Sequence, residues 1–201
     1  MNTLLAFIYV LSALVTTGYA LSCVNCVNLG GSSCTGKSVT CPAGSVCASH
    51  YVLAKSGSED SHIFIRSCLP KKQCTLEGSV TFTDGNIKIG TSCCNAKNCN
   101  PTFPLLPDDN SQVNNITCPA CISEDSETCS TSETILCTGN ETQCILQSTK
   151  IKGSKSFPVA LRGCSTKSFC DLGSQTLKHR DTTLNVKFTC TNENNYSHSE
   201  L

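Results

Sequence analysis

The 201-residue chain has no tryptophan, one methionine and few aromatic residues, which make up 5% of the sequence. It also has no net charge, because 15 basic residues balance 15 acidic ones. A neutral chain gives no electrostatic support for nucleic acid or an anionic membrane as a partner. After residue 20 the sequence has no amphipathic helical stretch of useful length. Nor does it contain an apolar run near the roughly 20 residues that a membrane-spanning helix needs.

The first 20 residues predict a secretory signal peptide (residues 1–20) that is cleaved after Ala20. They carry no charged side chain, and an apolar run from Leu4 to Val15 precedes the small residues Gly18 and Ala20. A run of about 12 residues is too short to span a bilayer. The polar ending, residues 191–201, lacks the hydrophobic tail of a lipid-anchor signal. We therefore expect a secreted, extracellular protein without a membrane anchor.

The chain is rich in cysteine, with 18 residues that all follow the predicted signal peptide. An even number of cysteines in an oxidising compartment indicates a disulfide framework, here of nine bridges. The pairs Cys23 and Cys26, and Cys118 and Cys121, also have the spacing of zinc ligands. The secreted context favours disulfides over zinc.

The cysteines form two copies of one pattern. Successive steps are 3, 8, 7, 6, 21, 6 and 19 from Cys23, and 3, 8, 8, 7, 20, 6 and 20 from Cys118. Agreement to within one residue indicates an internal repeat of one structural unit. Each unit has room for only a thin apolar core, which disulfides worth roughly 2–4 kcal/mol each would supplement.

Between the cysteines, apolar residues alternate as in β-strands. Val80 and Phe82 precede the turn Asp84-Gly85, and Ile87 and Ile89 follow it, with polar residues between them. A two-residue turn at that place would put Phe82 opposite Ile87 and Val80 opposite Ile89. Every apolar side chain of the hairpin would then lie on one face. The sequence therefore predicts all-β units built from long hairpins.

The cysteine spacing, the ending Cys93-Cys94-x4-Cys99-Asn100 and the start Leu21-Ser22-Cys23 resemble the three-finger domains of the Ly-6 antigen and urokinase-receptor superfamily. The resemblance implies an all-β fold of two tandem disulfide-rich, three-finger (snake-toxin-like) domains. The expected organisation is a first domain at 21–100, a proline-rich linker at 101–116 and a second domain at 117–201.

The resemblance also implies the disulfide pairs, which spacing alone cannot select. In the first domain they are Cys23 with Cys47, Cys26 with Cys34, Cys41 with Cys68, Cys74 with Cys93, and Cys94 with Cys99. In the second they are Cys118 with Cys144, Cys121 with Cys129, Cys137 with Cys164, and Cys170 with Cys190. The second domain lacks a final bridge, because Thr191 and Tyr196 stand where the first has Cys94 and Cys99.

The missing bridge and the blocks CTGNETQC (137–144) and LRGC (161–164) are similar to features of the gamma class of phospholipase A2 inhibitors. That resemblance implies a secreted, non-enzymatic inhibitor that binds secretory phospholipase A2 and assembles as a non-covalent oligomer. The same blocks are similar to the sodefrin precursor-like factors, so a pheromone-type signalling ligand is the alternative. A soluble form of an anchored receptor domain is a third interpretation.

The sequence shows no assembled catalytic acid, base and nucleophile, so we expect neither an enzyme nor a cofactor. Its four histidines, at positions 50, 62, 179 and 198, are far from any nucleophile motif. His50 and His62 could face each other across one hairpin, as a metal pair or as a simple cross-strand contact. The contact is favoured, because catalytic zinc usually has three protein ligands.

Three triplets are acceptors for N-glycosylation, and they begin at Asn115, Asn140 and Asn195. A glycan at Asn115 would shield the end of the linker.

Two stretches are candidate contacts for a partner. In the segment NPTFPLLPDDN (100–110), Phe103, Leu105 and Leu106 either pack between the two domains or remain exposed for a partner. The resemblance supports the second interpretation, because a proline-rich apolar segment at this place is a feature of the gamma inhibitors. The other stretch is the hairpin tip 150–157, which carries Lys150, Lys152 and Lys155. It is either a docking tip for an acidic partner or a solvated hairpin end.

Overall fold

The computed structural model of the chain describes residues 20–153, 156–179 and 181–191. The predicted signal peptide lies outside these residues except for Ala20, and so do Lys155, Asn195 and Tyr196.

The first unit consists of three antiparallel hairpins, the fingers. Its elements are β1 (Ser22–Leu29), β2 (Lys37–Thr40), β3 (Ser45–Ser56), β4 (Glu59–Pro70), the 3-10 turn η1 (Lys71–Gln73), β5 (Gly78–Phe82) and β6 (Gly85–Cys94). Across the sheet the strands follow the order β5-β6-β3-β4-β1-β2.

The second unit repeats this arrangement. Its elements are β7 (Val113–Pro119), β8 (Cys121–Ser123), β9 (Thr134–Thr138), β10 (Gln143–Lys152), β11 (Phe157–Ser165), α2 (Lys167–Cys170), β12 (Ser174–His179) and β13 (Thr182–Thr191). The order β12-β13-β10-β11-β8 matches β5-β6-β3-β4-β1, while β7 and β9 form a separate pair. The prediction of two tandem all-β, three-finger units is confirmed. β7 begins inside the segment that we expected to be linker.

Helix is almost absent from the described residues, which contain only η1 and the four-residue α2. No helix within the described ranges has the length and apolar character needed to cross a membrane.

Nine disulfides hold the base of the fingers, and none of the cysteines, all of which lie within the described ranges, is free. In the first unit they join Cys23 with Cys47, Cys26 with Cys34, Cys41 with Cys68, Cys74 with Cys93, and Cys94 with Cys99. In the second they join Cys118 with Cys144, Cys121 with Cys129, Cys137 with Cys164, and Cys170 with Cys190. Some of these cysteines form a buried cluster in each unit, namely Cys23, Cys41 and Cys47 in the first and Cys118, Cys137, Cys144 and Cys164 in the second. Sulfur thus takes much of the place that apolar side chains occupy in larger domains.

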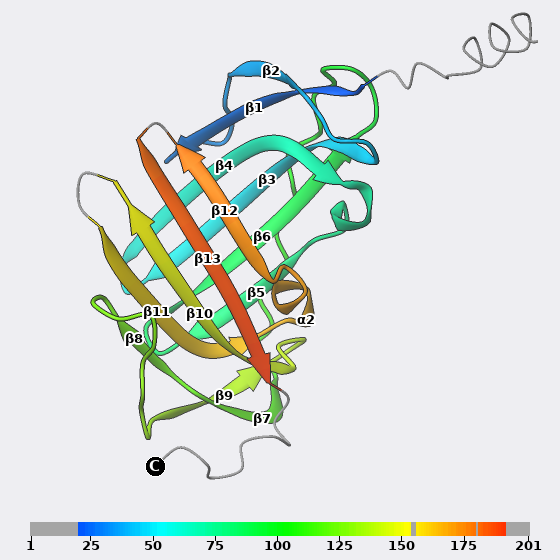
Figure 1. Cartoon of the computed structure of the whole chain (residues 1–201). Coiled ribbons are helices and arrows are strands. Elements are labelled where there is room, and N and C mark those ends of the chain that lie inside the picture. The colour runs from blue at the N-terminus through cyan, green and yellow to red at the C-terminus, as the bar shows by residue number, and fades with distance from the viewer. Residues whose placement is uncertain (1–19, 154–155, 180, 192–201) are drawn as a thin grey trace, which may run out of the picture.

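The two units share one continuous sheet, because edge strand β5 of the first pairs with β11 of the second (Figure 1). Thr81 lies opposite Cys164, and Val80 lies opposite Ser165. A buried apolar cluster spans this joint and combines residues of both units, namely Val80, Phe82, Ile145, Leu161 and Phe169. The joint is therefore a packed interface with its own core.

The register of the third finger differs from the predicted one. Phe82 lies opposite Gly85 and Val80 opposite Ile87, so the two-residue turn is Thr83-Asp84 and the predicted Asp84-Gly85 turn is wrong. Gly85 is needed in the strand, because a Cβ there would overlap the carbonyl oxygen of Lys55 on β3. The observed register differs from the predicted one by two residues. Because side chains alternate between the two faces of a strand, every side chain stays on its predicted face.

Candidate functional site

Residues 101–109, here called the strap, lie across one face of the first unit's sheet. On this face Tyr51 of β3 sits opposite Phe64 of β4 and opposite Gly90 of β6. Lys88 lies two residues before Gly90 and shares its face. The face therefore offers an aromatic platform beside a lysine and a glycine.

The prolines of the strap turn toward the sheet. Pro101 and Pro104 are buried, and Pro107 is partly buried. This three-residue period is that of a polyproline II helix, which has three residues per turn and no internal hydrogen bonds. With the prolines toward the sheet, Thr102, Phe103 and Leu105 are left exposed.

Polar contacts fix the strap backbone at both ends. The Ser92 hydroxyl donates to the Thr102 carbonyl, and the Lys88 ammonium donates to the Pro107 carbonyl at 2.7 Å. Lys88 Nζ also lies 2.7 Å from Asp109 Oδ1, and this contact lowers the pKa of the Asp109 carboxyl. The strap is thus held along β6 from Ser92 to Lys88.

Gly90 allows the centre of the strap to approach the sheet closely. A Cβ at this position would overlap the carbonyl oxygen of Leu105. Glycine inside a strand commonly marks a place where another backbone comes near. Gly90 and Lys88 therefore belong to the site, although the sequence did not identify them as site residues.

The three apolar strap residues have different environments. Phe103 packs on the first unit, with ring centroids 4.7 Å from Tyr51 and 6.1 Å from Phe64, and it remains 49% exposed. Leu105 is 81% exposed, whereas Leu106 is partly buried. Phe103 thus rests on the face of the first unit, while the shared core between the units is built from β5 and the second unit. The strap presents an ordered apolar strip with Leu105 at its most exposed point.

The two histidines of the second finger do not face each other, so the predicted contact between them is wrong. His50 lies opposite Ile65 and His62 opposite Leu53, which places the two rings on opposite faces of the sheet. His62 stacks on Tyr51, and its Nδ1 lies 2.7 Å from the Tyr51 hydroxyl. It therefore supports the aromatic platform under the strap.

His50 is a buried structural histidine. Its Nδ1 lies 2.9 Å from the Thr91 hydroxyl, and burial lowers its pKa to about 4.

Of the two described lysines at the other candidate contact, one is paired with a carboxylate. Lys150 Nζ lies 2.6 Å from Glu127 Oε1. Lys152 is exposed. Lys155 lies outside the described residues.

Two groups of three sulfur atoms are close enough together to hold a metal ion, one in each unit. All six cysteines are in disulfides, so none can supply a thiolate ligand. These groups are Cys23, Cys41 and Cys68, and Cys118, Cys137 and Cys164.

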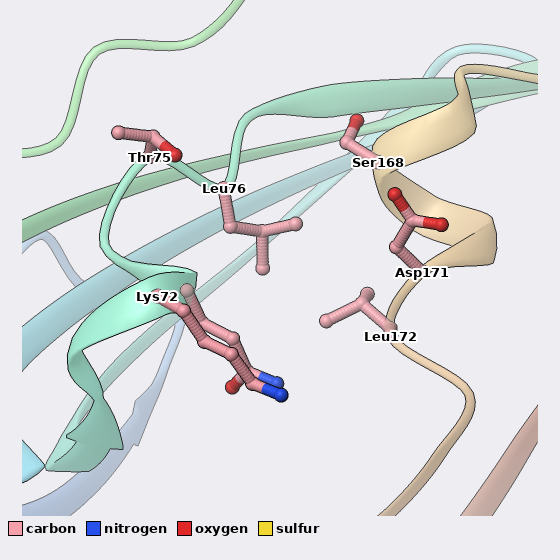
Figure 2. A pocket seen from close by; sticks show the side chains of 7 residues that line it. Lys72, Thr75, Leu76, Ser168, Asp171 and Leu172 are labelled. Carbon is pink, nitrogen blue, oxygen red and sulfur yellow. The ribbon is translucent and has the colours of Figure 1, made fainter. Parts of the chain in front are cut away.

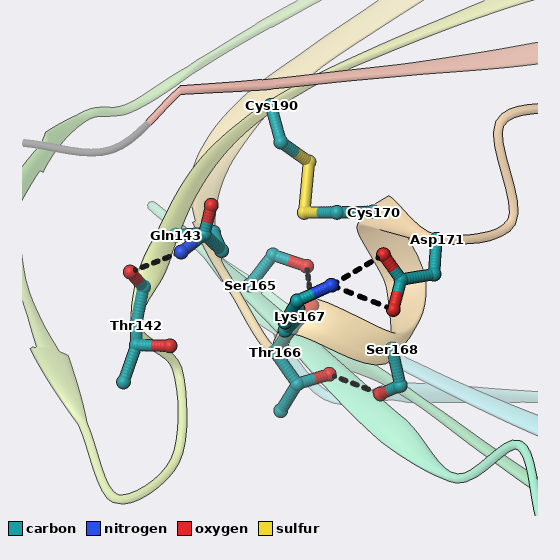
Figure 3. A network of polar contacts seen from close by, with 9 residues as sticks. All are labelled: Thr142, Gln143, Ser165, Thr166, Lys167, Ser168, Cys170, Asp171 and Cys190. Carbon is teal, nitrogen blue, oxygen red and sulfur yellow. Dashed lines mark hydrogen bonds and ion pairs between the residues drawn. A yellow bond between two sulfur atoms is a disulfide. The ribbon is translucent and has the colours of Figure 1, made fainter. Parts of the chain in front are cut away.

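A small pocket lies at the joint, between η1 of the first unit and α2 of the second (Figure 2). Lys72, Leu76, Ser168 and Leu172 are among the residues that line it. Its other charged group, Asp171, is already paired with Lys167 at 2.7 Å (Figure 3).

Two hydroxyl groups beside the pocket form hydrogen bonds between the two units. The Thr166 hydroxyl lies 2.9 Å from that of Ser168 (Figure 3), and Ser168 Oγ donates to the Glu77 carbonyl of the first unit. The backbone N–H of Ser79 donates to the Thr166 hydroxyl at 3.1 Å. The hydroxyls of Thr166 and Ser168 therefore join the two units.

Comparison with known proteins gives two matches along the chain to the family model of the u-PAR/Ly-6 domain, at residues 19–102 and 114–200. "Phospholipase A2 inhibitor NAI" of Notechis ater is 26% identical over 93% of this chain and 94% of its own length. A gamma-type phospholipase A2 inhibitor of Laticauda semifasciata is 26% identical over 63% of this chain and 71% of its own length. "Urokinase plasminogen activator surface receptor" of Bos taurus is 30% identical over 60% of this chain and 36% of its own length.

Proposed function

Because the chain belongs to the u-PAR/Ly-6 domain family, we propose that it is a secreted binding protein that inhibits a secretory phospholipase A2. Two of the relatives described above carry phospholipase A2 inhibitor in their names, and one of them matches nearly the whole chain. The strap supplies the contact in this proposal. Inhibition is then steric and non-covalent, with no chemical step performed by this chain.

The exposure of Leu105 carries the proposal. Its side chain is 81% exposed, although its backbone lies against Gly90 and the strap is held two residues further on by the bond from Lys88 to the Pro107 carbonyl. The chain therefore presents an apolar group at a fixed place. An exposed leucine on an ordered backbone gains free energy on binding and loses little conformational entropy. An enzyme that takes phospholipid from a lipid surface needs an apolar rim around its entrance. Leu105 and Phe103 are suited to such a rim.

The test compares Leu105→Ser with Leu29→Ser in the full-length protein. Leu29 is a matched control, because it is also strongly exposed, at 65%, but lies at the end of β1. Burying a leucine typically contributes about 1.5–3 kcal/mol, which corresponds to a loss of inhibition of about tenfold or more for Leu105→Ser. The readout is the inhibition constant against a panel of secretory phospholipases, with thermal unfolding to verify the fold.

Two results would contradict different parts of the proposal. If the unmodified protein inhibits no member of the panel, the proposed function is wrong. If it inhibits but Leu105→Ser is as potent as Leu29→Ser, the contact lies elsewhere. Lys152→Glu then tests the exposed lysine at the tip of the β10–β11 hairpin as the second candidate contact.

A further inference from the structure

The two-stranded sheet β7–β9 exposes apolar side chains on its outer face. Exposure alternates along β7, so that Val113, Asn115 and Thr117 face outward while the residues between them are partly buried. Leu136 of β9 lies opposite Thr117 and is also exposed. Val113 is 47% exposed and Leu136 is 58% exposed. The outer face thus carries two large apolar side chains with Asn115 beside them.

The side chain of Asn115 is held outward by its neighbour. Asn114 points inward, where its Nδ2 donates to the carbonyls of Gly139 and Glu141, each at 3.0 Å. Its Oδ1 accepts from the backbone N–H of Ile116 at 3.2 Å. These contacts fix a bulge in β7, and Asn115 within this bulge is exposed to solvent.

A purely structural reason for Asn115 also exists. Its φ is +66°, and asparagine tolerates this left-handed region better than most residues. This reason accounts for the asparagine but not for the exposure of Leu136 and Val113. Exposed apolar groups that lie together commonly mark a surface that something covers.

We propose that an N-linked glycan on Asn115 covers the apolar pair Val113 and Leu136. Asn115-Ile116-Thr117 is an acceptor triplet, and its first and third residues both lie on the outer face. In this proposal the first sugar residues lie over the two apolar side chains, and the C–H faces of the sugar rings pack on them. The inference rests on export through the secretory pathway, as the proposed function also does, but not on inhibition of a phospholipase.

The first test is occupancy in full-length protein secreted from mammalian cells, measured by mass spectrometry of glycopeptides. Thr117→Ala abolishes the acceptor without touching the backbone of Asn115, whereas Thr117→Ser preserves it and is the matched control. We expect the mass of one glycan to be lost in Thr117→Ala and kept in Thr117→Ser. An unmodified Asn115 in the secreted protein would overturn the proposal.

The second test asks what the glycan covers. Thr117→Ala is expected to increase binding of an apolar dye and self-association, and adding Leu136→Ser to it is expected to reverse both. Asn115→Gly also removes the acceptor, and glycine tolerates the positive φ at this position, so dye binding and self-association can be measured without backbone strain. Enzymatic removal of the glycan from the native protein allows dye binding and self-association to be compared without any substitution. Asn140→Gln removes the neighbouring acceptor as a control. Unchanged dye binding and association after loss of the Asn115 glycan would refute the covering role, whatever the result of the phospholipase assay.

Discussion

Glu141 of the second unit accepts a hydrogen bond from Ser79 of the first, with 2.7 Å between Oε1 and Oγ. Thr81, on the same strand as Ser79, donates to the same oxygen at 2.9 Å. Glu141 is only 3% exposed, and its burial raises the pKa of the carboxyl. The two hydroxyls and the charge of Lys88 lower this pKa, but by less. Glu141 is thus a buried carboxylate at the joint where β5 meets β11, and its hydrogen bonds and Lys88 offset the cost of burying its charge only in part.

We expect Glu141→Gln to stabilise the protein at neutral pH. The folded-state pKa lies above the unfolded value, so the folded protein binds more protons and loses stability as pH rises from about 4.5 through the folded pKa. A glutamine oxygen still accepts from Ser79 and Thr81 without a buried charge. Urea unfolding between pH 4 and pH 8 would measure the effect. Glu133→Gln, at an exposed carboxylate, controls for the loss of one charge. The same pH dependence in Glu141→Gln as in the unmodified protein would refute this assignment.

His50 is expected to have the opposite effect on stability. Burial lowers its pKa to about 4, below the 6.5 of an unfolded chain, so the folded state binds fewer protons between these values. The free energy of unfolding that depends on neutral His50 is fully present above pH 6.5 and is lost as the pH falls toward 4. The loss amounts to up to about 3 kcal/mol.

The substitution His50→Gln isolates this contribution. A glutamine can still bond to Thr91 but does not titrate, so the variant should lose less stability on acidification. Parallel unfolding curves at pH 7 and pH 4.5 measure the difference. An equal loss of stability in both proteins would mean that His50 does not carry it.

Alternation of apolar residues was enough to predict the all-β fold and the buried face of the third finger, because the face of a side chain depends only on its parity along the strand. The register could not be predicted in the same way. Gly85 looked like a turn residue, but it lies in β6 because of its contact with the backbone of Lys55, which comes from another finger. Spacing also left the disulfide pairs open, and these came from the resemblance.

The strap shows the same limit for the candidate site. Composition singled out Phe103, Leu105 and Leu106, but it could not rank their exposure, because this depends on Gly90 and Lys88 in β6. A glycine inside a strand was the available signal for a close backbone approach. The joint between the units could not be read from the sequence, since β5 and β11 are far apart along the chain and the pairing of edge strands is a tertiary contact.

Gly90→Ala should lift the strap from the sheet. The new Cβ meets the Leu105 carbonyl, which is backbone and cannot turn aside, so the strap must move. We expect lower stability and faster proteolysis within residues 101–109, because the contacts of Phe103 with Tyr51 and Phe64 loosen. Gly153→Ala, at an exposed glycine, is the control. Proteolysis at the rate of the control would show that the strap is not held through Gly90.

Gly163→Ala should weaken the joint between the units. A Cβ there would overlap the Thr81 carbonyl on β5, at the place where the two units share a sheet. In the unmodified protein, the shared sheet and the core containing Val80 and Ile145 should make the units unfold together, as one cooperative transition. In Gly163→Ala the units lose this coupling, so the second unit, which has four disulfides against five in the first, should unfold earlier.

Calorimetry under non-reducing conditions would resolve one transition or two. Two transitions in the unmodified protein would contradict the coupling, and one unshifted transition in the variant would place the joint elsewhere.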